Sequence, residues 1–140
     1  MSTSKGPTHL RNGLKTYPRS NVSDASNVKT AAYTVLAGDL IGKTIIMDSN
    51  AAAIITLPLI AGAGDGGIVT LVNNKRGQLL TVDPNASDGI NFGDQVVDGT
   101  TVVNTAATAE QGDYITLATV SSASTYWSVV GIGGTWAVGA

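Results

Sequence analysis

The sequence predicts an all-β protein, an antiparallel β-sandwich or barrel, with an extended N-terminal arm. Short runs rich in Val, Ile, Thr and aromatic residues recur about every 8–12 residues, which is typical of these folds. Clusters of Gly, Asn, Asp, Ser and Pro separate the runs. No window has the period of a ten-residue amphipathic helix, and the nearest candidate, Thr105–Gln111, is Ala-rich but short. We therefore predict an arm over residues 1–30 and a β-domain over residues 31–140.

Two apolar runs around a glycine loop form the expected centre of the domain. Residues 53–57 and 68–72 are rich in β-branched side chains, which suit a pleated and half-buried surface. Pro58 lacks the N–H that a strand ladder needs and ends the first run. The loop Gly62–Gly67 lacks both the Gly-Lys-Ser/Thr ending and the following helix of a phosphate-binding loop. We expect it to be a surface tip or a subunit-contact loop.

The other runs repeat this pattern along the chain. Gly38-Asp39 and 48–50 mark turns, and 73–77 has the composition of a hairpin connection. The expected strands, in chain order, are 32–36, 43–47, 53–57, 68–72, 78–82, 90–92, 95–97, 100–103, 113–120, 126–130 and 135–138.

The chain carries little charge, and that charge is unevenly placed. Charged residues make up 13% of the sequence, whereas soluble domains average about 25%. A surface this poor in charge is covered by partner subunits or by Ser, Thr, Asn and Gly. Residues 1–29 have a net charge of +4 and residues 30–140 a net charge of −6. This asymmetry indicates that the two parts have different partners.

Residues 1–29 show no sustained period of a helix or a strand. Alone, such a segment cannot bury enough surface to offset the entropy of ordering it, so it is either a solvated tail or an arm lying on another subunit. Fully extended, it reaches on the order of 100 Å, enough to cross a neighbouring subunit. We predict the arm. Its expected contact residues are Lys5, Leu10, Arg11, Leu14, Lys15, Tyr17 and Arg19.

Membrane spans, secretion signals and cysteine chemistry find no support in the sequence. No apolar run approaches the ~18 residues that cross a bilayer, and the N-terminus lacks the continuous apolar core of a signal peptide. The chain has no cysteine, which excludes disulfides and thiolate metal sites. We expect no membrane partner.

Residues for catalysis or cofactor binding are equally scarce. His9 is the only histidine and lies in the arm, so we expect no catalytic triad, and a two-histidine metal site cannot form within one chain. Glu110 is the only glutamate. Most aspartates adjoin Gly, Ser, Asn or Pro, where they typically hydrogen-bond their own backbone. We predict no enzyme activity, no cofactor and no small-molecule substrate.

One loop, Asp83–Asp94, partly matches a calcium-binding template. Asp83, Asn85 and Ser87 supply oxygen at its first, third and fifth positions, and Asp94 falls at its last. Asp88 stands where the template requires glycine, and no helices flank the loop. We therefore expect a plain turn, with a structural calcium site as the alternative.

Nucleic acid is not the expected partner of the arm. The arm offers five cations, but the acidic body would repel phosphates, and aromatic residues for base stacking are few. An acidic protein surface fits the arm better, because complementary charges favour encounter and register.

The span Tyr33–Trp136 resembles a β-rich module of tailed-bacteriophage virion proteins, found in tail fibres and in trimeric head-decoration proteins. The resemblance rests on the order and spacing of several short motifs and covers about three quarters of the chain. These are Tyr33-Thr34-Val35, 42–46, 53–58, 79–84, Gly89-Ile90, 112–117, 126–129 and Gly134-Thr135-Trp136. It implies a jelly-roll or β-tulip-like domain, a homotrimer and a structural role, and it brings no catalytic residues.

We therefore expect a capsid decoration, or cement, protein of the virion. It would be made in the host cytoplasm and bind the major capsid protein on the outer face of the head, with its arm on neighbouring subunits. A tail fibre is normally much longer than this chain. The alternative is a tail-fibre, spike or head-fibre module for host attachment, in which exposed aromatics such as Trp127 or Trp136 would stack on sugars.

Overall fold

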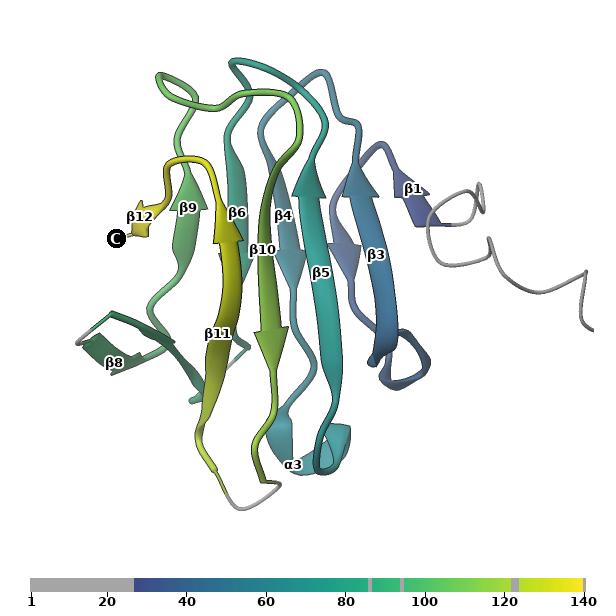
Figure 1. Ribbon diagram of the computed structural model, residues 1–140, viewed down its shortest axis with the longest axis vertical. Coiled ribbons are helices and arrows are strands. Elements are labelled where there is room, and N and C mark those ends of the chain that lie inside the picture. Colours follow the sequence, from purple (N-terminus) through teal and green to yellow (C-terminus); the bar gives the residue numbers. More distant parts are fainter. Residues whose placement is uncertain (1–26, 86, 94, 122–123, 140) are drawn as a thin grey trace, which may run out of the picture.

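The described residues of the computed structural model, 27–85, 87–93, 95–121 and 124–139, form two β-sheets (Figure 1). The predicted all-β class is confirmed. The seven-stranded sheet has the order β1-β3-β5-β10-β11-β7-β8, and the five-stranded sheet the order β12-β9-β6-β4-β2. The strands are β1 Val28–Lys29, β2 Tyr33–Thr34, β3 Ile41–Met47, β4 Ala53–Thr56, β5 Ile68–Asn73, β6 Leu80–Asp83, β7 Gly89–Phe92, β8 Gln95–Asp98, β9 Val102–Asn104, β10 Asp113–Ala118, β11 Tyr126–Gly133 and β12 Ala137–Val138.

The expectation of antiparallel sheets is wrong, because the first half of the chain pairs in parallel. Successive strands alternate between the sheets, so that β1, β3 and β5 are parallel neighbours in one sheet and β2, β4 and β6 in the other. Each connection crosses from sheet to sheet, so the next strand of the same sheet runs in the same direction. The later strands β9, β10 and β12 pair antiparallel, while β11 joins β7 in parallel.

The predicted hairpin at residues 73–77 is one of these crossings. It links β5 of the seven-stranded sheet to β6 of the five-stranded sheet. The composition of residues 73–77 correctly predicts a turn. A turn toward the adjacent strand and a turn toward the opposite sheet use the same residue types, so the composition does not distinguish between them.

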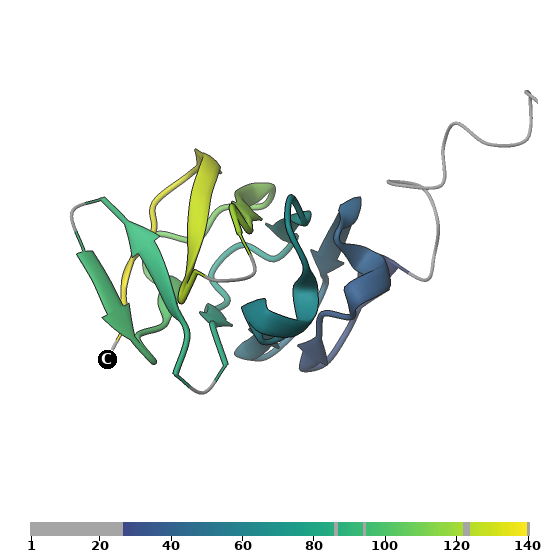
Figure 2. The same ribbon diagram turned by 90° about the horizontal axis from the view of Figure 1, so that it is seen from below.

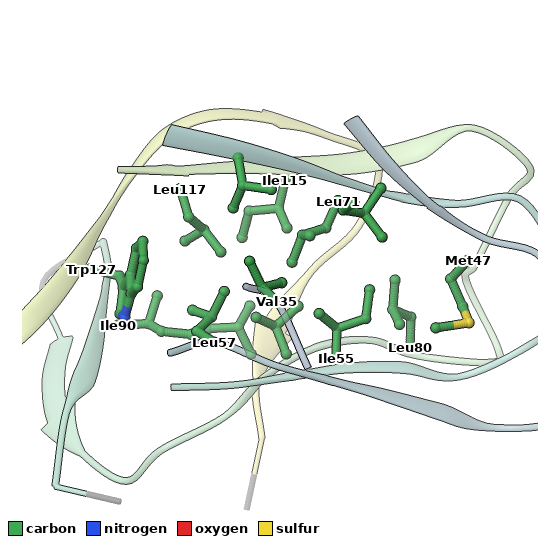
Figure 3. Packing of buried hydrophobic residues seen from close by; sticks show 14 of the residues in the cluster. Val35, Met47, Ile55, Leu57, Leu71, Leu80, Ile90, Ile115, Leu117 and Trp127 are labelled. Carbon is green, nitrogen blue, oxygen red and sulfur yellow. The ribbon is translucent and has the colours of Figure 1, made fainter. Parts of the chain in front are cut away.

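The hydrophobic core lies between the two sheets (Figure 3). Alternate residues of each strand point into it, as in the pattern of buried Ala53 and Ile55 on β4, or Ile115 and Leu117 on β10. Trp127 closes one end of the labelled cluster, and Met47 lies at the other. Burying each such side chain contributes about 1.5–3 kcal/mol, so this core supplies most of the stability of a chain without disulfides.

Helical structure in the described residues is limited to short segments. The 3-10 helix η2 spans Ala37–Asp39, and α3 spans Ile60–Ala63, inside the region expected to be a plain glycine loop. The Ala-rich candidate Thr105–Gln111 forms turns instead. Buried Ile60 anchors α3 to the core.

The described chain begins inside the predicted arm. Val28 and Lys29 pair with Ile46 and Met47 as an edge strand of the seven-stranded sheet, and Asn27 before them is buried. The predicted arm contacts Lys5, Leu10, Arg11, Leu14, Lys15, Tyr17 and Arg19 all lie outside the described residues.

Candidate assembly surfaces

The outer face of the seven-stranded sheet presents three cross-strand rows without a single charged residue. Its strands β1, β3, β5, β10 and β11 hold these rows in register. Because side chains alternate along a strand, the residues between the core-facing ones form this outer surface. We call it the uncharged face: an apolar row of Val28, Ile46, Val72, Tyr114 and Gly133; a threonine row of Thr44, Thr70 and Thr116 with Gly131; and a third row of Ile41, Ile68, Ala118 and Ser128.

The side chains of the uncharged face are small or aliphatic, except for the aromatic ring of Tyr114. A Cβ at Gly133 would collide with the ring of Tyr114, so this ring lies over the glycine. The hydroxyls of Thr70 and Thr116 hydrogen-bond each other at 2.8 Å between oxygen atoms. Tyr114 remains 39% exposed and Ile41 73% exposed. The exposed apolar side chains of its two outer rows make this face a candidate interaction surface.

Large apolar side chains also gather where this face meets one end of the molecule. Leu36, Leu59 and Val120 are exposed there, beside Ile41 and Ile68 of the third row. The three connections that carry them are joined by backbone hydrogen bonds, from Ile68 N–H to the Leu40 carbonyl and from Gly66 N–H to the Thr119 carbonyl, both 3.0 Å. These connections lie at the end of the molecule that carries η2 and α3, which also holds the ion pair between Asp39 and Lys43 (Figures 1 and 2).

The opposite end of the molecule is polar and ion-paired. The ammonium of Lys75 lies 3.5 Å from a carboxylate oxygen of Asp48, and Arg76 Nε lies 3.1 Å from Glu110. Asn74 donates to Asp48 at 3.0 Å. These connections follow β3, β5 and β9 at the top of Figure 1. Lys75 and Arg76 thus pair with carboxylates of the neighbouring connections.

Below this end, a buried polar network joins the two sheets. Asn104 on β9 donates to Asp113 Oδ2 on β10 and to the Thr135 carbonyl, both at 2.9 Å. Its own carbonyl accepts from Asn73 Nδ2 on β5 at 2.7 Å. Asp113 Oδ2 also accepts the Glu110 N–H at 3.0 Å. Every side-chain group of Asn104 is thus used in holding the sheets together.

A second polar cluster lies near η2. Asp39 Oδ2 accepts from the Tyr33 hydroxyl at 2.7 Å and from the Leu36 N–H at 2.9 Å, and Lys43 approaches Oδ1 at 3.5 Å. Burial, followed by the hydrogen bond to Asp39 and its negative charge, raises the pKa of Tyr33 to about 12. Burial alone would raise the pKa of Asp39, but the Leu36 N–H, the Tyr33 hydroxyl and Lys43 outweigh it and lower this pKa. A neutral tyrosine donating to a carboxylate is a structural arrangement.

The candidate calcium loop uses its carboxylates for backbone contacts. Asp83 Oδ1 accepts the N–H of Asn85 at 3.1 Å, as in an Asx-turn, and Asn85 has a left-handed φ of 70°. Buried Asp88 accepts the N–H of Ile60 at 2.8 Å. Asp94 lies outside the described residues. Among the residues that are described, no group of three or more His, Asp or Glu side chains could hold a metal ion.

An open cavity of about 450 Å³ lies beside β11, at the point where β7 no longer pairs with this strand. β7 pairs with β11 only over Tyr126–Ser128. Asn91, Phe92, Gly93, Ser128, Val129 and Ile132 line the cavity. This lining has no ionisable side chain, so it offers no acid, base or charged anchor for a substrate.

The two tryptophans lie inside the protein. Trp127 is fully buried, and its Nε1 has no hydrogen-bond partner among the described residues. Trp136 is also buried and donates from Nε1 to the Gly133 carbonyl at 2.9 Å. Neither ring presents a stacking surface for a sugar.

Sequence reasoning missed the uncharged face. Its signal was the absence of charge at alternate positions of the runs around Thr44, Thr70 and Thr116. That signal has meaning only once the register places these residues side by side.

The described part of the chain has no helix with both the length and the apolar character needed to span a membrane. Comparisons with protein-family models, with curated proteins and with solved structures find no match to this chain.

Proposed function

We propose that this chain is a structural virion protein, a capsid decoration or cement protein on the outer face of a bacteriophage head. It binds the major capsid protein, assembles as a homotrimer and stabilises the shell by adding contacts between capsid subunits. Its β-domain consists of two sheets in which the first six strands pair in parallel. The observation that supports this best is the uncharged face, because an apolar and charge-free sheet surface suits subunit contact and no catalysis.

The distribution of charge supports a separate role for the arm. Residues 1–29 are basic, whereas the body is acidic, and three of its cations, Lys43, Lys75 and Arg76, are paired with its own carboxylates. An acidic capsid surface would therefore be met by the positive charge of residues 1–29, which have a net charge of +4. The buried tryptophans do not offer the stacking surface that host attachment would use, so we propose decoration rather than attachment.

Removing residues 1–26 tests this proposal. The shortened protein should fold, because β1 and everything after it are retained, and it should lose binding to heads purified without the decoration protein. Binding is measured by co-sedimentation with the heads. Lys75→Gln is the matched control: it removes a cation from the body instead of the arm and should leave binding unchanged. Full-strength binding of the shortened protein, or a copy number in purified virions as low as that of a fibre, would contradict the proposal.

A further inference from the structure

We infer that copies of this chain contact one another through the uncharged face, with the threonine row at the centre of the contact. The outer faces of the two sheets differ in the charge that their rows carry. On the five-stranded sheet, the outward row of Thr34 and Thr56 continues to Asp83, which places a carboxylate on that face. On the seven-stranded sheet, all three rows are free of charge. Over β1, β3, β5, β10 and β11, the uncharged face can therefore be covered without desolvating a charge.

The absence of charge also indicates which partner covers the uncharged face. The arm carries Lys5, Arg11, Lys15 and Arg19, and the uncharged face has no carboxylate to pair with any of them. An acidic capsid surface would likewise meet no cation there. A second copy of this chain brings the same uncharged rows, so neither side of the contact leaves a charge unpaired.

The size of the face is adequate for such a contact. Five strands spaced about 4.8 Å apart and three rows spaced about 6.7 Å apart cover on the order of 500 Å² per copy. Two copies in contact bury on the order of 1,000 Å² in total, which is at the low end for a specific contact between two chains. The exposed side chains of Leu36, Leu59 and Val120 extend the apolar surface beyond the three rows.

Thr70 lies at the centre of the face. It belongs to β5, the middle strand of the five, and to the middle row of the three, between Thr44 and Thr116. When a symmetry axis passes through this face, the copies of position 70 lie near one another. A charge introduced there meets the same charge on each neighbour, so either sign should separate the copies.

The experiment compares Thr70→Lys and Thr70→Glu with the wild-type full-length protein by sedimentation velocity at micromolar concentration. The wild type should sediment as the trimer of about 43 kDa, three times the 14.2 kDa of the chain, and both variants as the monomer. Mixing the Lys and Glu variants should restore the assembly only in part, because two of the three copies in any mixed trimer still carry the same charge. Circular dichroism confirms that each variant is folded.

Two controls isolate the face. Thr70→Val removes the hydrogen bond to Thr116 without adding charge and should remain assembled. Thr81→Lys places a lysine at a half-buried outward position of β6, a central strand of the other sheet, and should also remain assembled.

A monomeric wild type, an assembly that survives both charged variants, opposite effects of Lys and Glu, or dissociation of Thr81→Lys would each overturn the inference. The inference deepens the proposed trimer and rests on the proposed function for its stoichiometry. The two can fail separately, since sedimentation tests contact between copies and co-sedimentation with heads tests decoration.

Discussion

At the scale of single residues, Thr119 fixes the glycine loop that precedes β5. Its hydroxyl donates to the Gly64 carbonyl at 2.8 Å and accepts the Gly67 N–H at 2.9 Å. Its backbone exchanges two further bonds, with Gly66 N–H and the Gly67 carbonyl. Gly67 is packed so closely that a Cβ would lie 3.2 Å from both Leu40 and Thr119. The inner end of the expected surface tip is therefore a buried anchor.

We predict that Thr119→Val lowers the free energy of unfolding by about 1–3 kcal/mol, measured by urea denaturation. Valine keeps the shape but leaves the Gly67 N–H and the Gly64 carbonyl without the hydroxyl, and an unpaired buried polar group costs about this much. Thr70→Val is the control, because its hydroxyl bonds only the half-buried Thr116 at the surface. Equal effects of the two substitutions would show that the buried position of Thr119 does not matter.

At the scale of elements, the sequence was sufficient to locate strands but not to pair them. The runs at 43–47, 53–57, 68–72 and 113–120 all contain strands, because their β-branched and alternating residues act locally. Pairing depends on whether each turn leads to the adjacent strand or across to the other sheet. Residues such as Asp48–Asn50 permit both, so the parallel order of the first six strands was not predictable.

The same limit explains what was found of the candidate surfaces. The positive charge of residues 1–29 was visible in the sequence because charge can be counted without a fold. The uncharged face was not, because Val28, Ile46, Val72 and Tyr114 form a row only through the register of four strands. The two-residue strand β1 was likewise hidden inside the expected arm, since Val28-Lys29 alone has no period.

Strand β1 provides a prediction about where the arm ends. Removing residues 1–29 should lower the midpoint of thermal unfolding by several degrees relative to removing residues 1–26. The longer deletion removes the pairing of Val28 with Ile46, the 2.7 Å bond from Asp48 N–H to the Lys29 carbonyl, and the contact of the Lys29 ammonium with the Tyr33 ring at 4.2 Å. Calorimetry of the two shortened proteins makes the comparison. Identical midpoints would mean that β1 adds nothing to the stability of the sheet.

At the scale of the whole molecule, two different devices hold the sheets together. Apolar side chains fill most of the space between them, and near the ion-paired end the Asn104 network takes over. A buried polar network is stabilising only when all its members are satisfied, and here each has a partner in the other sheet or in a connection. This network also fixes the relative position of β5, β9 and β10, which apolar packing alone specifies less strictly.

Substitution of Asn104 by leucine should therefore destabilise the protein more than a comparable change nearby. We expect Asn104→Leu to lower the free energy of unfolding by about 2–4 kcal/mol in urea denaturation, because Asn73, Asp113 and the Thr135 carbonyl each lose a partner in a buried site. Asn74→Leu is the matched control: it removes an amide at the same end whose partners, Asp48 and Gln111, are more accessible, and should cost less than about 1 kcal/mol. If the two variants unfold alike, apolar packing alone joins the sheets. If only Asn104→Leu is affected, the polar end of the molecule is held by this network.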